Sequence, residues 1–304
     1  MNESPVTAPV CYRHPSKETY VRCSRCDRPI CPDCMNEASV GHQCPECVAQ
    51  GRRTQRPART AFGGSAAGRA GTATKTLIGV NVLVMVMSIL SGGANAVAGG
   101  GMGGLLGSST PLTQWGAVLG SAVYGPAGDV SLHGIAGNGE WYRLFTAMFL
   151  HYGVLHLLMN MYALWILGRD LERVLGPLRF VGLYVLAGLG GNVAAYALAA
   201  PNQATAGAST AVFGLMAAIF VLLRRLNLSV APILPVIVIN VIFTFAVASI
   251  SVEGHLGGLF TGFVAGGILA YAPRDKRNLV QGVGLAAVFV ILMAIAVYRT
   301  LMLT

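Results

Sequence analysis

Apolar segments of helical length recur along the chain from about residue 75 onward, and short polar segments separate them. A helix needs roughly 20 apolar residues to cross the about 30 Å hydrocarbon core of a bilayer. Seven segments reach or approach this length, at Lys75–Ala94, Val154–Leu171, Leu178–Ala199, Ser209–Leu223, Ser229–Ile250, His255–Ala272 and Leu279–Tyr298. The pattern therefore predicts an all-α polytopic membrane protein with seven spans.

Composition excludes the class of ordinary soluble globular proteins. Of the 304 residues, 54% are hydrophobic and only 11% are charged, and the mean hydropathy is +0.61. Such a chain is far more apolar than a soluble domain. The first apolar segment lies beyond residue 70, so we expect no secretory signal peptide, and we expect the first span to anchor the chain.

The basic residues indicate how the spans are oriented. Most of them fall on one common side of the predicted spans, as Arg52, Arg53, Arg56, Arg59, Arg69 and Lys75, then Arg169, Arg173 and Arg179, then Arg224 and Arg225, then Arg274, Lys276 and Arg277. By the positive-inside bias we expect a multi-pass protein of the cell membrane with a cytoplasmic N-terminus and an external C-terminus. The formal net charge of +9 then reflects topology and contact with the lipid bilayer, and it requires no nucleic-acid partner.

The first 50 residues hold all seven cysteines. Potential ligands recur in pairs with CxxC-type spacing, at Cys11/His14, Cys23/Cys26, Cys31/Cys34 and Cys44/Cys47. Two such pairs complete one tetrahedral zinc shell, so we expect two structural zinc ions. Disulfides are the alternative, but a cytoplasmic location keeps thiols reduced, and so short a segment cannot build a sufficient core unaided.

The order of the pairs resembles a B-box-type zinc finger, in which alternate pairs share an ion. The short separation between Cys26 and Cys31 favours this cross-braced arrangement over sequential pairing. One ion is then held by Cys11, His14, Cys31 and Cys34, and the other by Cys23, Cys26, Cys44 and Cys47. His42 could replace Cys44, although the CxxC spacing favours the cysteine. With no open ligand position, the module is expected to be structural and to bind a cytoplasmic protein partner.

We expect three domains: a double zinc-binding module at residues 1–50, a flexible basic linker at 51–74, and a membrane domain at 75–300. Between the first two spans, residues 91–138 are rich in glycine and are expected to be irregular and external. The stretch GEWYRLFTAMFLH that follows, at residues 139–151, is amphipathic and aromatic. It is expected to lie at the membrane interface, with His151 as an interfacial residue outside any site.

Four polar residues within the spans indicate where chemistry takes place: His156, Asn160, Ser209 and His255. Polar groups in a span are costly and by default suggest function. The second, fourth and sixth spans run in the same direction, so all four residues lie near the external end at one depth. Taken singly, the serine is better explained by helix packing, the asparagine is explained by contact between two helices, and a histidine at a helix start is equally often an interface residue.

These four residues provide the reagents of nucleophilic catalysis. A serine hydroxyl becomes nucleophilic when a neutral imidazole takes its proton, and Ser209 with His255 supplies that pair. His156 and Asn160 lie four residues apart on one helix face and are able to donate hydrogen bonds to one oxyanion. No carboxylate occurs at this depth in the spans, so the sequence predicts a dyad rather than a triad.

Small residues predict close packing of the fourth and sixth spans. Gly258, Gly262 and Gly266 recur every four residues on a face that also carries His255. The fourth span has Gly214, Ala217 and Ala218, and such residues let helix backbones approach closely. Phe213 lies one turn beyond Ser209 on the same face and is expected to support the imidazole ring. Generic helix packing explains the same glycines without catalysis.

Three ordered blocks resemble the rhomboid intramembrane serine proteases: EWYRLFTAMFLHYGVLHLLMNM, GASTAVFG and GHLGGLFTG. The resemblance covers roughly residues 75–300 and implies a six-helix core, here followed by a seventh span. It implies Ser209 as nucleophile, His255 as base, and His156 with Asn160 as oxyanion donors. Trp141 and Arg143 match the family's membrane-interface loop, Phe213 stands where an aromatic residue backs the histidine, and Phe243 and Phe245 are candidates for the substrate gate.

The chain departs from the family pattern at Thr210 and Gly254, where glycine and alanine are common. Neither change removes a reagent. We therefore expect a serine endopeptidase that cuts single-span membrane proteins in or near their transmembrane segments, with no cofactor needed for catalysis. The alternatives are a catalytically weak or inactive relative that binds membrane clients, and a transporter whose polar residues line a path.

Overall fold

The computed structural model describes residues 8–54, 59–65, 71–97, 108–124, 131–247 and 250–304. The chain divides into two compact units, Met1–Pro57 and Ala58–Thr304. The small unit contains all the cysteines, and the large unit contains all the long apolar helices.

The small unit has little regular structure. It contains the 3-10 helix η1 (Pro32–Cys34), the antiparallel strands β1 (Asn36–Glu37) and β2 (His42–Gln43), and the helix α1 (Pro45–Thr54). Its buried core consists of six of the cysteines together with Ile30. None of the seven cysteines forms a disulfide. Among the described residues Ile30 is the only fully apolar side chain in that core, so we expect the stability of this unit to depend on metal ligation.

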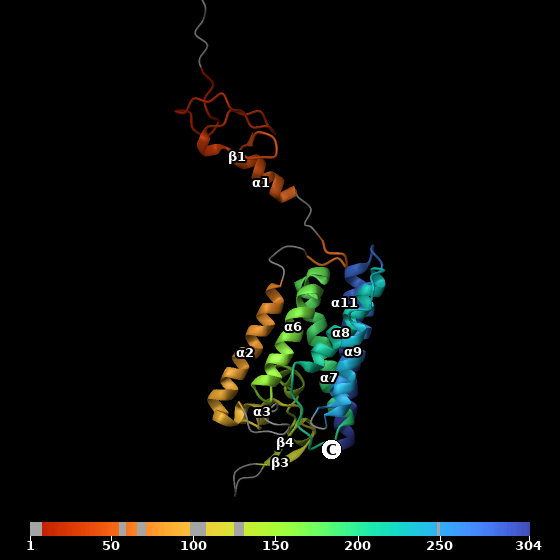
Figure 1. Cartoon of the computed structure of the whole chain (residues 1–304). Helices are drawn as coiled ribbons and strands as arrows, with labels where there is room; N and C mark the ends of the chain where they lie inside the picture. The colour runs from red at the N-terminus through yellow and green to blue at the C-terminus, as the bar shows by residue number, and fades with distance from the viewer. Residues whose placement is uncertain (1–7, 55–58, 66–70, 98–107, 125–130, 248–249) are drawn as a thin grey trace, which may run out of the picture. The chain divides into compact units, whose positions relative to one another are not determined.

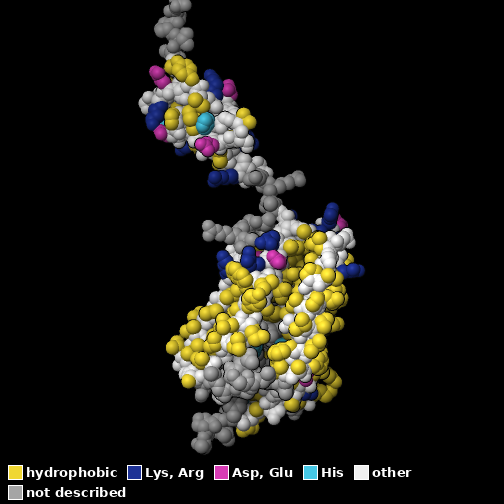
Figure 2. Space-filling model, viewed as in Figure 1, with side chains coloured by type: hydrophobic (Ala, Val, Ile, Leu, Met, Phe, Trp, Pro, Cys, Tyr) yellow, Lys and Arg dark blue, Asp and Glu magenta, His cyan; other side chains and the backbone are white. Residues whose placement is uncertain are grey.

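The large unit is a bundle of helices, with one helix at each of the seven ranges predicted as spans (Figure 1). They are α2 (Thr72–Gly92), α6 (Val154–Leu175), α7 (Pro177–Leu198), α8 (Ser209–Arg225), α9 (Leu234–Ala246), α10 (Val252–Tyr271) and α11 (Arg277–Leu303). On the face of the large unit seen in Figure 2, hydrophobic side chains cover the bundle and most Lys and Arg side chains gather at one end. The expected all-α membrane fold is confirmed.

Not every helix is long enough to cross a bilayer. In the described part of the chain, four helices qualify as spans by length and composition, namely α2, α7, α10 and α11. A fifth span arises if α6 is joined to the preceding segment Arg143–Phe149, from which it is bent by 89°. That segment contains α5 (Arg143–Thr146) and η3 (Ala147–Phe149). The helix α8 has 17 residues and α9 has 13.

The predicted span Ser229–Ile250 is wrong in length. The helix α9 covers only Leu234–Ala246, and at about 1.5 Å per residue it extends about 20 Å. Prolines at positions 232 and 235 oppose a helix at the residues before them and leave no room to extend it toward Ser229. At the other end, Val247 has an extended backbone.

The helices α8 and α10 pack backbone against backbone through the glycines predicted for this purpose: Gly258, Gly262 and Gly266. A Cβ atom added at Gly262 would lie 2.2 Å from the Cα atom of Gly214, and one at Gly258 would lie 2.0 Å from the carbonyl oxygen of Thr210. Such distances exclude any side chain at these positions. The glycine face of α10 therefore determines how closely its first turn, with His255, approaches the first turn of α8, with Ser209.

The region between α2 and α6 is more ordered than expected. It contains the 3-10 helix η2 (Gly93–Ala96), the short helices α3 (Pro111–Gly116) and α4 (Ile135–Asn138), and a hairpin of β3 (Ala122–Tyr124) and β4 (Ser131–His133). The prediction of an irregular region at 91–138 was wrong for these parts, and residues 98–107 and 125–130 lie outside the described structure. Short elements with mixed polarity leave no periodic signal in the sequence.

Arg143 anchors this external region to the bundle. Its side chain is 1% exposed. The Nε atom donates to Glu140 Oε2 at 2.5 Å, and Nη1 donates to the carbonyl oxygens of Gln114 and Ala117 at 2.7 and 2.9 Å. Glu140 in turn accepts from the Gly134 N–H at 2.7 Å. One buried ion pair thus connects α3, α4 and α5.

The linker predicted to be flexible at 51–74 contains a turn that is fixed to the bundle. Phe62 is 3% exposed and belongs to the core of the large unit. Its carbonyl oxygen accepts from Gln281 Nε2 at 3.2 Å, and the Ala61 carbonyl oxygen accepts from Arg277 Nη1 at 3.1 Å. A Cβ atom at Gly64 would lie 1.9 Å from the Leu175 carbonyl oxygen. Residues 59–65 therefore end the linker against the last residue of α6 and against α11, while residues 55–58 and 66–70 lie outside the described structure.

Candidate active site

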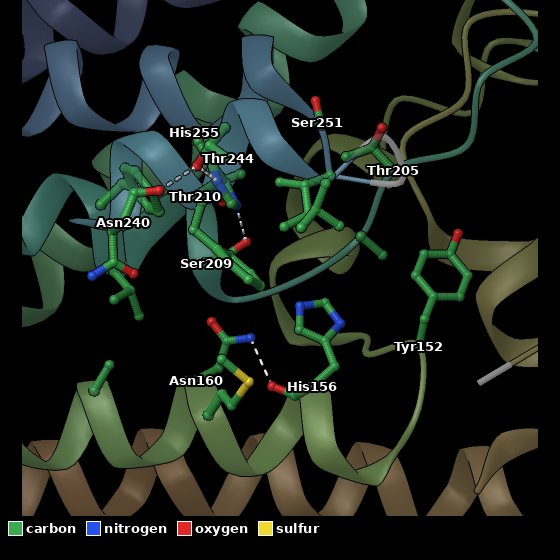
Figure 3. A pocket seen from close by; sticks show the side chains of 18 of the residues that line it. Tyr152, His156, Asn160, Thr205, Ser209, Thr210, Asn240, Thr244, Ser251 and His255 are labelled. Carbon is green, nitrogen blue, oxygen red and sulfur yellow. Dashed lines mark hydrogen bonds between the residues drawn. The ribbon is translucent and has the colours of Figure 1, made fainter. Parts of the chain in front are cut away.

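Ser209 and His255 are hydrogen-bonded to each other. Ser209 is the first residue of α8, and His255 lies in the first turn of α10. Ser209 Oγ and His255 Nε2 are 2.7 Å apart (Figure 3), although the two residues are 46 positions apart in the chain. Ser209 is partly exposed and His255 is buried. The geometry suits transfer of the hydroxyl proton to the imidazole.

The imidazole of His255 is held on two further sides. The ring of Phe213 stacks on it with centroids 4.1 Å apart and an interplanar angle of 22°. On its far side, His255 Nδ1 lies 2.8 Å from Thr244 Oγ1, which comes from α9 (Figure 3). Sequence reasoning named Phe213 but missed Thr244. The sequence gives only a weak indication of this residue, because Thr244 is the one hydroxyl residue in the apolar helix LPVIVINVIFTFA.

His156 faces the nucleophile across Gly207. A Cβ atom added at Gly207 would lie 3.1 Å from His156 Nε2 and 3.2 Å from Ser209 Oγ. The space that this missing Cβ leaves open is thus bordered by both groups. Gly207 has a φ of +148°, which also favours glycine. Within the described part of the chain, His156 Nδ1 has no hydrogen-bond partner, so nothing prevents Nε2 from carrying the proton.

Asn160 lies one turn after His156 and is buried. Its Nδ2 atom donates to the His156 carbonyl oxygen at 2.9 Å (Figure 3). An amide nitrogen carries two protons, so one remains for a ligand in the cavity. Both residues come from the first two turns of α6.

His151, which the sequence placed at the interface outside the site, is instead buried beside it. It is 3% exposed, and its ring centroid is 5.1 Å from that of His156 in an edge-on arrangement. His151 Nε2 lies 3.5 Å from the backbone N–H of Ala208, the residue before the serine. The bend before α6 turns this residue inward, while its depth relative to the membrane interface stays a prediction.

A cavity of about 180 Å³ joins these groups. Its polar lining residues include His156, Asn160, Ser209, Asn240, Thr244 and His255 (Figure 3). Apolar residues of α6, α8 and α9, Thr210, and residues of the connecting segments at 152, 203–206, 247, 250 and 251 contribute to the rest. A cleft with an apolar wall and a few convergent polar groups is the usual form of a substrate site.

The residues proposed for the substrate gate and the interface loop differ in where they lie. Phe243 is among the residues that line the cavity, whereas Phe245 is 63% exposed and is not one of them. Trp141 is on the surface, with 38% of its area exposed. Arg143 points inward, to Glu140. Glu140 was missed in the sequence, where the letters EWYR place an acid three positions before the arginine.

The small unit brings its potential ligands together in two groups. One consists of Cys11, His14, Cys31 and Cys34 and the other of Cys23, Cys26, Cys44 and Cys47, and within each group the ligand atoms lie within 4.8 Å of one another. Cys26 Sγ and Cys44 Sγ are 3.8 Å apart, and His14 Nδ1 is 3.3 Å from Cys31 Sγ. A tetrahedral ion with bonds of about 2.3 Å to sulfur requires sulfur atoms about 3.8 Å apart. His42 is in neither group.

Residues 138–272 match the family model of the rhomboid domain. The chain is 38% identical over 160 residues to the rhomboid protease GluP of Bacillus subtilis (strain 168). The aligned stretch covers 50% of this chain and 31% of GluP. It is 36% identical over 145 residues to the putative rhomboid protease YdcA of the same organism, which covers 46% of this chain and 72% of YdcA.

A third relative differs in its described activity. The chain is 39% identical over 82 residues to the inactive rhomboid protein 1 of Danio rerio, which covers 27% of this chain and 10% of that protein. The chain thus spans under a third of GluP and a tenth of the Danio rerio protein. The rhomboid match at 138–272 contains Ser209 and His255 and ends before α11.

Proposed function

The chain belongs to the rhomboid family, and from this we propose that it is an intramembrane serine endopeptidase in which Ser209 is the nucleophile and His255 the base. The observation that carries the proposal is the 2.7 Å contact between Ser209 Oγ and His255 Nε2 at the edge of a cavity. A serine that served only helix packing would have no need of a buried imidazole at this distance.

The proposed reaction has two halves. Ser209 Oγ attacks the peptide carbonyl carbon while its proton passes to His255 Nε2, and the imidazolium then gives that proton to the leaving amine nitrogen. Water next attacks the acyl-serine, His255 again accepts and returns a proton, and the acid is released. The chain's own residues supply every proton transfer.

His156 and Asn160 are the proposed donors to the negative oxygen of the tetrahedral intermediate. The position of His156 Nε2 across Gly207 from Ser209 Oγ supports this role. The backbone N–H of Ser209 at the start of α8 is a further donor. Loss of one such donor typically costs about 3 kcal/mol of transition-state stabilisation.

We propose single-span membrane proteins as substrates. A peptide bond in a helix is shielded by its hydrogen bonds, so the substrate must unwind before attack. Ser209 and His255 lie at the first turns of their helices, where water and irregular backbone are tolerated. Substrates with small or helix-weakening residues near their outer boundary fit this arrangement. The corresponding orientation has the N-terminus in the cytoplasm and the C-terminus outside.

For the small unit we propose two structural zinc ions and a cytoplasmic protein partner. The Cys₃His and Cys₄ donor sets match the preference of zinc, and each set fills four positions. The unit then contributes no group to the reaction. Its domain limits, 1–50 with a linker at 51–74 before the membrane domain at 75–300, remain part of this proposal.

The test is co-expression of the full chain with tagged single-span reporters. We expect a released fragment from the wild type and none from Ser209→Ala or His255→Ala. A fluorophosphonate probe should label the wild type but not Ser209→Ala. Fragment release that persists in both variants would contradict the proposed roles of these residues.

A second candidate is a catalytically weak or inactive relative that binds membrane clients. The likeness to an inactive rhomboid protein favours it, and so does Thr210, a bulky residue directly after the serine. Thr210 is accommodated opposite Gly191, where an added Cβ would lie 2.6 Å from the Thr210 Cβ atom. Absence of labelling and cleavage, with reporters still co-purifying, would favour this candidate over the protease.

A further inference from the structure

Thr244 makes two short contacts that together decide where its proton lies. Its Oγ1 atom is 2.8 Å from the carbonyl oxygen of Asn240, one turn earlier in α9, and 2.8 Å from His255 Nδ1. A hydroxyl has one proton to donate, and a carbonyl oxygen is only an acceptor. If the proton pointed at Nδ1, the two oxygens would face each other 2.8 Å apart with no proton between them. Both contacts are hydrogen bonds only if Thr244 donates to Asn240 and accepts from Nδ1–H.

This assignment determines the tautomer of His255. With the proton on Nδ1, the Nε2 atom carries a lone pair, and Nε2 lies 2.7 Å from Ser209 Oγ. Only this tautomer is able to accept the serine proton. The other tautomer would present an N–H to Ser209 and would be unable to act as a base.

We propose that Thr244 is the positioning residue of His255, holding its Nδ1–H and thereby selecting the tautomer in which Nε2 serves as the base. This inference rests on the proposed role of His255. Thr244 does not touch the reacting atoms. It occupies the place that a carboxylate takes in a three-residue triad.

The surroundings explain why a hydroxyl is used. Thr244 is 1% exposed and His255 is 8% exposed. A carboxylate buried at this position would carry a large desolvation penalty, whereas a hydroxyl whose proton already has an acceptor does not. A neutral partner also orients the ring without binding it as tightly as an ion would.

Thr244 also connects α9 to the site. Among the described residues of α9 it is the only buried one, while Ile239, Ile242 and Phe245 are each more than 60% exposed. The hydroxyl contact is therefore the inward anchor of this helix. The base is in its competent tautomer only while α9 lies against α10.

The test compares Thr244→Val, which removes the hydroxyl but keeps the shape, with Thr244→Ser, which keeps the hydroxyl. We expect Thr244→Val to lower kcat for a single-span reporter by about 10- to 100-fold, with KM within about twofold, since general-base catalysis contributes at least about 100-fold. Thr244→Ser should recover most of the rate. Thr261→Val, the same change at a buried threonine elsewhere in the bundle, is the matched control and should leave kcat unchanged.

A second readout does not depend on activity. In full-length protein with ¹⁵N-labelled histidine, the His255 signals should show the proton on Nδ1 in the wild type and in Thr244→Ser, and a mixture of tautomers in Thr244→Val. Signals are assigned with His255→Ala. A wild-type proton on Nε2, or an unchanged kcat in Thr244→Val, would overturn the inference. If the wild type neither cleaves nor labels, the proposed function fails, and the tautomer measurement still decides the role of Thr244.

Discussion

The small unit and the large unit of this chain have cores of different composition. The small unit has a core of cysteines with a single isoleucine, so we expect its fold to depend on what the cysteines bind. The large unit has an extensive apolar core in which helices α8 and α10 touch through glycine backbones. The stability of the small unit should therefore be sensitive to removal of a metal ligand, and that of the large unit to added side-chain volume. Each of the following changes should affect one unit without the other.

Removing metal is expected to have the largest effect, and only on the small unit. Structural zinc in small domains contributes roughly 10 kcal/mol or more to folding. A strong chelator, or Cys31→Ser, should therefore make residues 8–54 exchange amide hydrogens at unfolded rates, as measured by mass spectrometry. Fluorophosphonate labelling of Ser209 should not change. Protection of the small unit that survives complete metal removal would show that the cysteines are not its main support.

Adding one methyl group should have the converse effect. At Gly262 a Cβ atom would lie 2.1 Å from the Gly214 carbonyl oxygen, whereas at Gly267 of the same helix no atom lies within 4 Å. We expect Gly262→Ala to destabilise the large unit by about 3 kcal/mol. Gly267→Ala should be neutral or stabilising by up to about 1 kcal/mol. Unfolding in detergent followed by circular dichroism measures both, and equal effects would refute backbone contact as the basis of this packing.

Gly207→Ala should separate activity from stability within the large unit. The added Cβ would fill the space between His156 Nε2 and Ser209 Oγ. Since displacement of a reacting group by about 1 Å is able to cost about 100-fold in rate, we expect a loss of that order in fluorophosphonate labelling. Zinc content of the small unit should stay the same. Labelling at the wild-type rate would mean that His156 and Ser209 do not share this space.

Glu140 is expected to make a smaller, electrostatic contribution to the stability of the large unit. Burial alone would raise the pKa of Glu140, but the Gly134 N–H, Arg143 and His133 lower it below its ordinary value of 4.5. A lowered pKa means stabilisation that is present above pH 4.5 and is lost as the pH falls through the folded-state value. We expect Glu140→Gln to cost about 2 kcal/mol at pH 7.

The same unfolding assay, repeated from pH 7 downward, tests this prediction. The difference between wild type and Glu140→Gln should shrink below pH 4.5. A difference that does not depend on pH would indicate that Glu140 acts by shape alone.

The sequence predicted what periodicity and spacing encode. The apolar segments located the seven long helices of the bundle. The CxxC spacing gave the ligand pairs, and the cross-braced order of a B-box-type finger grouped these potential ligands as the structure does. Other features have no such signal. The turn at Phe62 lies in an aperiodic stretch, and its burial depends on Gln281 and Arg277, more than 200 positions away in the chain.

The candidate site shows the same limit. The sequence predicted that Ser209, His255, His156 and Asn160 lie at one depth in the membrane and so form one site. Their roles stay predictions until they are tested. Thr244 was not found, because one hydroxyl in an apolar helix is usually explained by a bond to its own backbone. It does make that bond, to Asn240, and its second contact is visible only once α9 is placed beside α10.

The shortness of α9 has a consequence for the lipid around it. A helix of 13 residues is about 10 Å shorter than the hydrocarbon core, and its outward side chains are apolar. If α9 crosses the bilayer, we expect lipid tails beside it to shorten or tilt to match it, which would compress the bilayer locally. A foreign helix that drifts to this side would lose part of its hydrocarbon cover at both ends. The protein would then weaken an incoming helix before any of its residues touches it.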